Sequence, residues 1–215
     1  MNYDVIMKQF YCRGKENRIS LIEKYEITPV SHLILLNGQT KRSAAEDKIT
    51  REYYCFIYRK KNSEEKFDTF IVGNYVAKHF LELLNLEPLP LFNILKDNQN
   101  IQNKSTGNIT SVKKNNWNPL AKELYNIINI ILLAWDTSGG ILGEILMNVQ
   151  KYYYKEPFLS NIKSVNTIIG NDNRTIFQML EFIKKSNDIK EFKFPLIDKI
   201  LLENKIKNNI TGNGI

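Results

Sequence analysis

Apolar side chains gather most densely in a stretch near the middle of the chain. Residues 119–154 read PLAKELYNIINIILLAWDTSGGILGEILMNVQKYYY, and in the first half apolar residues recur every three or four positions. This spacing is that of one helix face. Asn118 is a suitable N-cap, and Pro119 suits the first helical position, where its missing N–H costs nothing. We therefore predict a helix from Pro119, buried on most sides because Ile130 and Leu133 widen its apolar stripe.

A second helix is predicted directly after this one. Gly139 and Gly140 permit a reversal of the chain, and apolar residues then recur at helical spacing from Ile141 through Leu146 to Val149. A connection of about four residues makes consecutive helices antiparallel neighbours. We expect the pair to form the inner wall of the protein, with Ile128, Ile131 and Leu146 buried.

The first third of the chain has the shorter apolar spacing of strands. Residues 1–72 are predicted to be mainly strands, with the clearest segments at 3–12, 30–36, 49–61 and 66–72. The last two of these segments predict a hairpin, because only a short charged loop separates them. The stretch 18–22 is a weaker strand candidate, and 41–48 is predicted to be a loop or a short helix.

The remaining segments complete the predicted order of elements. Residues 73–96 predict a helix over 75–86, followed by a connection that contains Pro88 and Pro90. Residues 97–118 are predicted to be a mobile polar loop, residues 119–207 a helical region, and residues 208–215 a frayed tail. Within the helical region, we expect a short strand or a turn of helix at 158–169 and two further helices at 174–185 and 195–207.

Strands that precede helices along the chain are typical of an α+β fold. We predict one domain over residues 1–215, in which an antiparallel sheet from the N-terminal third packs against a helical C-terminal half. A chain of 215 residues can bury about 70% of its unfolded surface and needs neither a disulfide nor a metal to fold.

Composition adds a basic net charge to this picture. The formal charge is +7 and the pI about 9.2, which favours polyanionic partners. The chain is also rich in Asn, Ile and Lys, as coding by an AT-rich genome would make it, and this bias raises the lysine count without selection for binding. Cys12 and Cys55 are expected to be buried free thiols, and no apolar stretch of signal-peptide length opens the chain. We predict a cytoplasmic protein with no membrane segment.

The strand around residue 55 combines aromatic and basic side chains. Alternation along 51–61 places Tyr54, Phe56, Tyr58 and Lys60 on one face, which would be a stacking platform for nucleic acid if it were exposed. The alternative is that these rings fill the core of the sheet. The predicted nucleic-acid-binding residues, with the lysines of the polar loop included, are Arg51, Tyr54, Tyr58, Arg59, Lys60, Lys61, Lys113 and Lys114.

Motifs for catalysis or for metal binding are weak in this sequence. The candidate metal ligands Cys12, His32, Cys55 and His79 stand apart and do not form a C-x-x-C or H-x-x-x-H pair. We predict no catalytic residue, no cofactor and no metal. One alternative is a Mg²⁺-dependent nuclease site in the Glu64-x-Lys66 stretch, with Asp68 close by.

These observations predict a non-enzymatic intracellular basic protein that binds nucleic acid or a nucleic-acid-associated complex. A protein-binding inhibitor or accessory subunit from a mobile element or defence system is the alternative of another class, since the helical half carries a large apolar surplus. The nuclease is a second alternative.

Overall fold

The computed structural model describes residues 10–96, 116–135 and 139–213. The predicted mobile loop lies almost wholly outside the described residues, as does the first predicted strand up to residue 9. The chain divides into two compact units. The first unit comprises residues 1–93 and 128–148, and the second comprises residues 94–127 and 149–215. The division therefore passes through two helices, α4 (Pro119–Ala134) and α5 (Ile141–Lys151).

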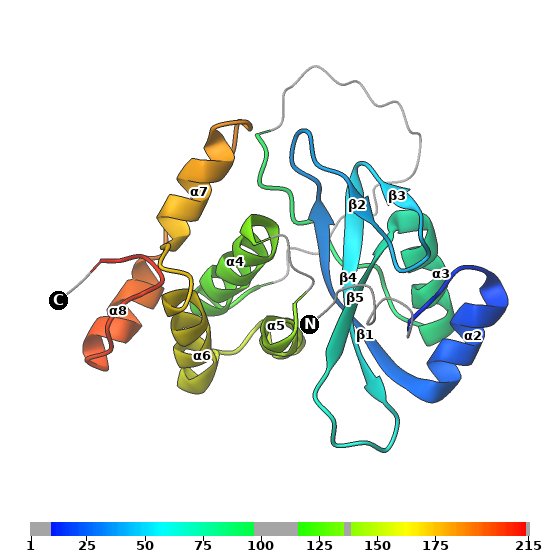
Figure 1. The fold of residues 1–215 in the computed structure, drawn as a ribbon. Coiled ribbons are helices and arrows are strands. Elements are labelled where there is room, and N and C mark those ends of the chain that lie inside the picture. The colour runs from blue at the N-terminus through cyan, green and yellow to red at the C-terminus, as the bar shows by residue number, and fades with distance from the viewer. Residues whose placement is uncertain (1–9, 97–115, 136–138, 214–215) are drawn as a thin grey trace. The chain divides into compact units, whose positions relative to one another are not determined.

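The first unit is built on a three-stranded antiparallel sheet. Its strands β1 (Tyr25–Ile34), β4 (Glu52–Lys60) and β5 (Asp68–Gly73) lie in the order β1-β4-β5, with β4 in the centre (Figure 1). The predicted hairpin is confirmed, because Tyr54 pairs with Val72 and Phe56 with Phe70. The α+β prediction is also confirmed, since an N-terminal antiparallel sheet is followed by helices in the C-terminal half.

One face of this sheet is covered by helix α3 (Asn74–Leu84), which begins directly where β5 ends. Aromatic rings fill the contact: the ring centroids of Phe56 and Phe80 lie 5.6 Å apart, and those of Phe56 and Phe70 lie 5.1 Å apart. Val76 and Ala77 of α3 belong to the same buried cluster. The apolar spacing that predicted this helix is therefore its core-facing stripe.

The opposite face of β4 is buried as well. Ile57 points away from Phe56 because successive side chains of a strand alternate, and it lies against Gly143 of α5. A Cβ atom built on Gly143 would come within 2.7 Å of Ile57 Cγ2 and 3.6 Å of Val30 Cγ2. Helix α5 therefore touches the sheet with its backbone, and only glycine fits at that point.

Helix α4 contacts the sheet through a buried polar pair. The hydroxyl of Ser31 in β1 donates a hydrogen bond to Oδ1 of Asn129, which is fully buried. Ile128, Ile131 and Leu146 are all fully buried, which confirms their predicted place in the interior. No helix within the described residues is long and apolar enough to cross a bilayer.

The predicted N-terminus of α4 is confirmed at atomic detail. Oδ1 of Asn118 accepts hydrogen bonds from the backbone amides of Leu120 at 3.0 Å and Ala121 at 3.2 Å. These amides belong to the first helical turn and have no partner within the helix. The sequence Asn-Pro thus marks the start of this helix as expected.

Residues 1–72 are not mainly strands at their start: the weaker strand candidate at 18–22 is wrong, because it lies in helix α2 (Lys15–Lys24). Gly14, at φ 85°, precedes the helix and sets its direction. Arg18, a charged residue, is buried in this helix. Its Nε donates to Nδ1 of His79 at 2.8 Å and its guanidinium donates to the carbonyl of Cys12 at 3.1 Å. Because a charged residue faces inward, the apolar spacing of this helix is obscured.

Residues 41–48 also differ from the predicted loop or short helix, because together with Ile49 they contain two short strands. They form a small antiparallel pair, β2 (Lys41–Arg42) and β3 (Lys48–Ile49). The turn between them is held by Ser43, whose hydroxyl accepts hydrogen bonds from the amides of Ala45 and Asp47.

The second unit is helical. It contains α6 (Leu159–Gly170), α7 (Ile176–Lys184) and α8 (Pro195–Glu203), so the predicted short strand or single turn at 158–169 is wrong. That segment is a helix of 12 residues, with Ile162, Val165 and Ile169 buried along one face. The predictions at 174–185 and 195–207 are confirmed as helices, although α8 ends earlier, at Glu203.

The predicted fraying of the tail is wrong for residues 208–213. Asn208 and Ile210 are buried. The Asn166 side chain in α6 accepts hydrogen bonds from the amides of Asn209 at 2.8 Å and Ile210 at 3.3 Å. The carboxylate of Asp198 accepts a further hydrogen bond from the side-chain Nδ2 of Asn208. Residues 214–215 lie outside the described part of the chain.

Candidate functional site

The structure places the predicted aromatic platform inside the protein. Tyr54 is 2% exposed and Tyr58 7% exposed, and both rings belong to the core cluster between the sheet and α3. The Tyr58 hydroxyl donates to Asp68. The prediction that these two rings bind nucleic acid is therefore wrong, because bases cannot reach them. The alternative that the rings fill the core is confirmed.

Of the basic residues predicted beside those rings, Arg51 does not converge with Arg59, Lys60 and Lys61. Arg51 and Lys60 lie at opposite ends of β4, and nine strand residues at about 3.3 Å each separate such ends by roughly 30 Å. Arg59 is engaged locally: its Nε lies 2.6 Å from Glu26 Oε2, and its guanidinium covers the ring of Phe67 at 4.5 Å. Lys60 and Lys61 are exposed at the end of the strand. The predicted sites at positions 113 and 114 lie outside the described residues.

The candidate metal ligands are dispersed over the first unit. In the described ranges, no group of three His, Cys, Asp or Glu side chains could hold a metal ion. Cys12 and Cys55 are buried free thiols, as predicted, and burial raises the pKa of each to about 12. Thiols of this kind are inert as nucleophiles. The nuclease candidate Asp68 has both oxygens engaged, one by the Tyr58 hydroxyl and one by the amide of Thr69.

His32 occupies a buried polar position at the edge strand β1. Its ring stacks on Tyr54 with 4.0 Å between centroids, and its Nδ1 lies 3.2 Å from the carbonyl oxygen of Leu89. Its Nε2 lies 3.7 Å from a carboxylate oxygen of Glu52. Burial lowers the pKa of His32, and this effect outweighs the opposing influence of Leu89 and Glu52. Nε2 is buried and makes no hydrogen bond within the described residues, so the ring is held by its stack on Tyr54 and by the contact of Nδ1 with Leu89.

A pH dependence of stability follows from the lowered pKa of His32. The unfolded chain binds a proton near the ordinary value of about 6.5, before the folded protein does, so stability falls as pH decreases through that value. We expect urea unfolding to show a lower free energy of unfolding at about pH 5.5 than at about pH 7.5. His32→Phe keeps a ring against Tyr54 and should reduce this difference. If the variant and the wild type had the same pH dependence, His32 would not be its source. The lowered pKa of His79 acts in the same direction, and it remains in both proteins.

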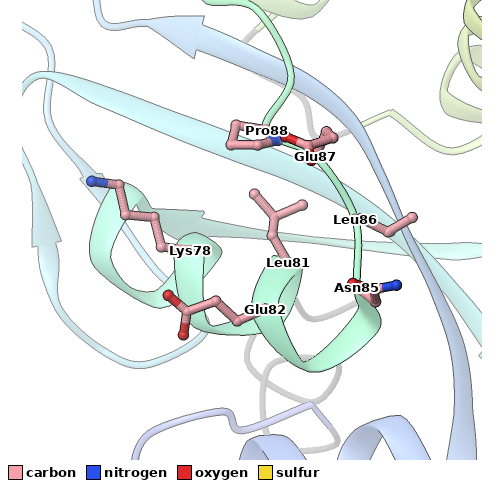
Figure 2. A pocket seen from close by; sticks show the side chains of 7 residues that line it. All are labelled: Lys78, Leu81, Glu82, Asn85, Leu86, Glu87 and Pro88. Carbon is pink, nitrogen blue, oxygen red and sulfur yellow. The ribbon is translucent and has the colours of Figure 1, made fainter. Parts of the chain in front are cut away.

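A shallow pocket of about 300 Å³ lies in the first unit, beside the C-terminal end of α3. Figure 2 shows Leu81 directed toward Pro88 across it, with Glu82 on the same helix. Asn85 ends the helix in a left-handed conformation, at φ 52°, and thereby directs the following segment over the pocket. Its lining mixes acidic, basic and apolar groups without a convergent set for catalysis.

The second unit carries an exposed group of aromatic and lysine side chains that sequence reasoning missed. It is formed where the start of α4 meets the turn after α5: the backbone amide of Asn118 donates to the carbonyl of Tyr153 at 2.8 Å. We call this group the aromatic–lysine surface. Its members are Trp117, Lys122, Tyr125, Lys151, Tyr152, Tyr153, Tyr154 and Lys155.

Four rings of this surface form a continuous row from the interior to the solvent. Tyr125 is buried, and the centroid of Trp117 lies 4.9 Å from it. Tyr153 lies 5.6 Å from Trp117 and holds Tyr154 in an edge-on contact at 5.4 Å. Tyr154 is 56% exposed and Tyr152, beside it in the chain, 40% exposed. The packed inner rings therefore support the exposed ring of Tyr154.

Lysine ammonium groups lie over these rings. Nζ of Lys122 is 4.9 Å from the centroid of Trp117 and 4.5 Å from that of Tyr125. Lys122 is exposed as a residue, yet desolvation against the rings lowers the pKa of its ammonium group. Nζ of Lys155 lies 5.8 Å from Tyr152 and 5.6 Å from Tyr154. At exposed sites a cation–π contact between an ammonium group and a ring is weak. These lysines therefore remain available to anions.

The local sequence contained a signal for this surface. Residues 151–155 read KYYYK, with lysines on both sides of three consecutive tyrosines. Trp117 and Lys122 could not be joined to that stretch by sequence spacing, because more than twenty-five residues separate them from it. The backbone contact between Asn118 and Tyr153 brings the two segments together.

Comparison with known proteins gives a family but no described relative. No curated protein and no solved structure matches the chain. One family model matches residues 11–207, a range that includes every residue of the aromatic–lysine surface. Since the match covers most of the chain, the protein belongs to the family described as Uncharacterised conserved protein UCP028583.

Proposed function

We propose that this protein is a non-enzymatic, intracellular nucleic-acid-binding protein and that the aromatic–lysine surface makes the contact. The single observation that carries the proposal is the exposed Tyr152–Lys155 turn, in which two solvent-facing tyrosine rings lie within 6 Å of a lysine ammonium group. Stacking rings with adjacent cations are the two components that nucleic-acid-binding surfaces combine.

The charges of this surface support the proposal. Lys151 and Lys155 are exposed, and no ion pair involves either one in the part of the chain that the structure describes. Glu156 is the acidic residue nearest to these two lysines in the sequence. The carboxylate of Glu123 already accepts hydrogen bonds from the backbone amides of Leu196 and Ile197. A net charge of +7 favours association with phosphates over the whole chain. The two buried free cysteines suit a reducing compartment such as the cytoplasm.

Binding should be measured by fluorescence anisotropy of labelled oligonucleotides over a series of salt concentrations. Affinity is expected to increase as salt decreases, because phosphate contacts release counterions. The double variant Lys151→Gln/Lys155→Gln removes two phosphate contacts and should reduce the slope of log K against log salt by about 1.4 for a single strand, at about 0.7 for each contact.

The matched control is Lys15→Gln/Lys24→Gln, which removes the same charge from two exposed lysines of the first unit that were not predicted to bind nucleic acid. This control should leave the slope within error of wild type. If it reduced the slope as much as the first variant, binding would depend on net charge rather than on this surface. Absence of binding at low salt would refute the proposed function altogether.

A protein partner is the second candidate, and a specific feature of the second unit favours it. Phe158, Phe182 and Leu202 are large apolar side chains that are 74%, 62% and 57% exposed. Exposed apolar residues of this size are typical of partner contacts where they are contiguous. In that case the protein would act as an inhibitor or accessory subunit, and substitution of Phe182 would abolish a complex whose formation is insensitive to salt.

A further inference from the structure

We infer that the aromatic–lysine surface takes single-stranded nucleic acid in preference to a duplex, with unpaired bases stacked on Tyr152 and Tyr154. This inference rests on the proposed function, since it names the substrate class of the same surface. Binding of this kind requires rings that bases can reach, a support that holds those rings in place, and cations close enough to contact the phosphates of the stacked nucleotides.

The rings are accessible because they stand on a turn. Residues 152–154 follow the last helical turn of α5, and the Tyr152 carbonyl accepts a hydrogen bond from the amide of Lys155 at 2.8 Å, which closes the turn. Tyr154 is more than half exposed. A base in a duplex has both of its faces covered by neighbouring bases, whereas a base in a single strand offers a free face to an aromatic ring.

The shape of the surface also disfavours a duplex. The major groove of a duplex is read by an α-helix or a two-stranded ribbon that enters it. The exposed tyrosines here stand on a short turn between two helices, α5 and α6, and the helix ends on either side carry Lys151 and Phe158. A turn of this kind presents side chains to a flexible strand but offers no element that follows a groove.

The support and the cations complete the argument. Tyr153 is held through its carbonyl by the Asn118 amide and packs between Trp117 and Tyr154, so the exposed ring is preorganised for stacking. Lys155 lies over both exposed rings in the free protein. A base–aromatic stack is stronger than an exposed cation–π contact. An incoming base therefore displaces the ammonium group from the ring face, and the freed lysine reaches the adjacent phosphate.

The test compares a labelled single-stranded oligonucleotide with its duplex, using the full chain and the double variant Tyr152→Leu/Tyr154→Leu. Leucine keeps an apolar side chain but removes the π-face. Loss of stacking for one base should weaken single-strand binding by about 5- to 150-fold, and loss for two bases should weaken it further, whereas duplex binding should not change. Tyr75→Leu is the matched control, because this tyrosine on α3 is 77% exposed and lies in the first unit.

Each outcome separates the inference from the proposed function. Tighter binding of the single strand, lost in the tyrosine variant and retained in Tyr75→Leu, supports the inference. Equal binding of single strand and duplex, weakened by the Lys151/Lys155 variant but not by the tyrosine variant, overturns the inference and leaves the proposed function standing. No binding of either oligonucleotide at low salt overturns both. Circular dichroism of each variant establishes that it is folded.

Discussion

Gly143→Val is expected to destabilise the protein by about 3 kcal/mol, because a valine at this position overlaps with the core side chain of Ile57. Even a single Cβ atom here would lie 2.7 Å from Ile57 Cγ2, closer than carbon atoms approach without a shift of one of them. Val30 closes the same contact from β1, at 3.6 Å. Thermal unfolding followed by circular dichroism should show a decrease in Tm of roughly 6–12 °C for a chain of this length.

A mutant cycle identifies the contact responsible. Gly143→Ala/Ile57→Ala removes the methyl group that a Cβ atom would meet, so the double variant should be at least about 1 kcal/mol more stable than the sum of the single effects predicts. Asn148→Val, at an exposed position of the same helix, should change stability by less than about 0.5 kcal/mol. An effect of Gly143→Val no larger than that of Asn148→Val would show that α5 does not pack on the sheet in this way.

Local signals allowed most helices and the hairpin to be predicted. Asn118 and Pro119 mark the start of α4, and Oδ1 of Asn118 makes the two capping hydrogen bonds expected of it. The change of period at Gly73 likewise marks the boundary between β5 and α3. Such signals depend on residues within one turn or strand of each other, and they are therefore contained in the sequence itself.

The predicted binding site failed because exposure is a property of the fold. Alternation along β4 identified which side chains share a face, and Tyr54, Phe56 and Tyr58 do share one. Alternation cannot show which faces are covered. In a sheet with helices on both sides, as the contacts of Phe80 and Gly143 establish here, both faces of the central strand are interior. The basic residues at the ends of such a strand are then separated by its whole length.

The aromatic–lysine surface was missed for the converse reason. Trp117 and Tyr153 are brought together by the Asn118 amide, a contact between residues far apart in the sequence. The tyrosines at 152–154 come directly after Val149, the last apolar position of the predicted second helix. Their exposure follows from a turn that ends α5, and no periodicity extends across such a turn.

The tail illustrates the same limit with polar residues. Its composition, NNITGNGI, is typical of a frayed terminus. In the structure its backbone is bound by Asn166, a residue of α6 that is itself buried: its Nδ2 donates to the carbonyl of Lys207 at 2.8 Å, and its Oδ1 accepts from the amides of Asn209 and Ile210. One side-chain amide thus replaces three partners that water would supply to a free tail.

Asn166→Ala is therefore expected to destabilise the second unit by about 3 kcal/mol, because it leaves buried backbone groups without partners at about 1–3 kcal/mol each. Amide hydrogen exchange should accelerate at Ile210, whereas Ser164→Ala, at an exposed position of the same helix, should leave the exchange unchanged. Asn166→Asp separates the two roles of the amide. It keeps the oxygen that accepts from Asn209 but places a second oxygen against the Lys207 carbonyl, so it should be as damaging as alanine. If Asn166→Ala were as stable as Ser164→Ala, the tail would be held by the hydrogen bonds of Asp198 to Asn208 and Thr211 instead.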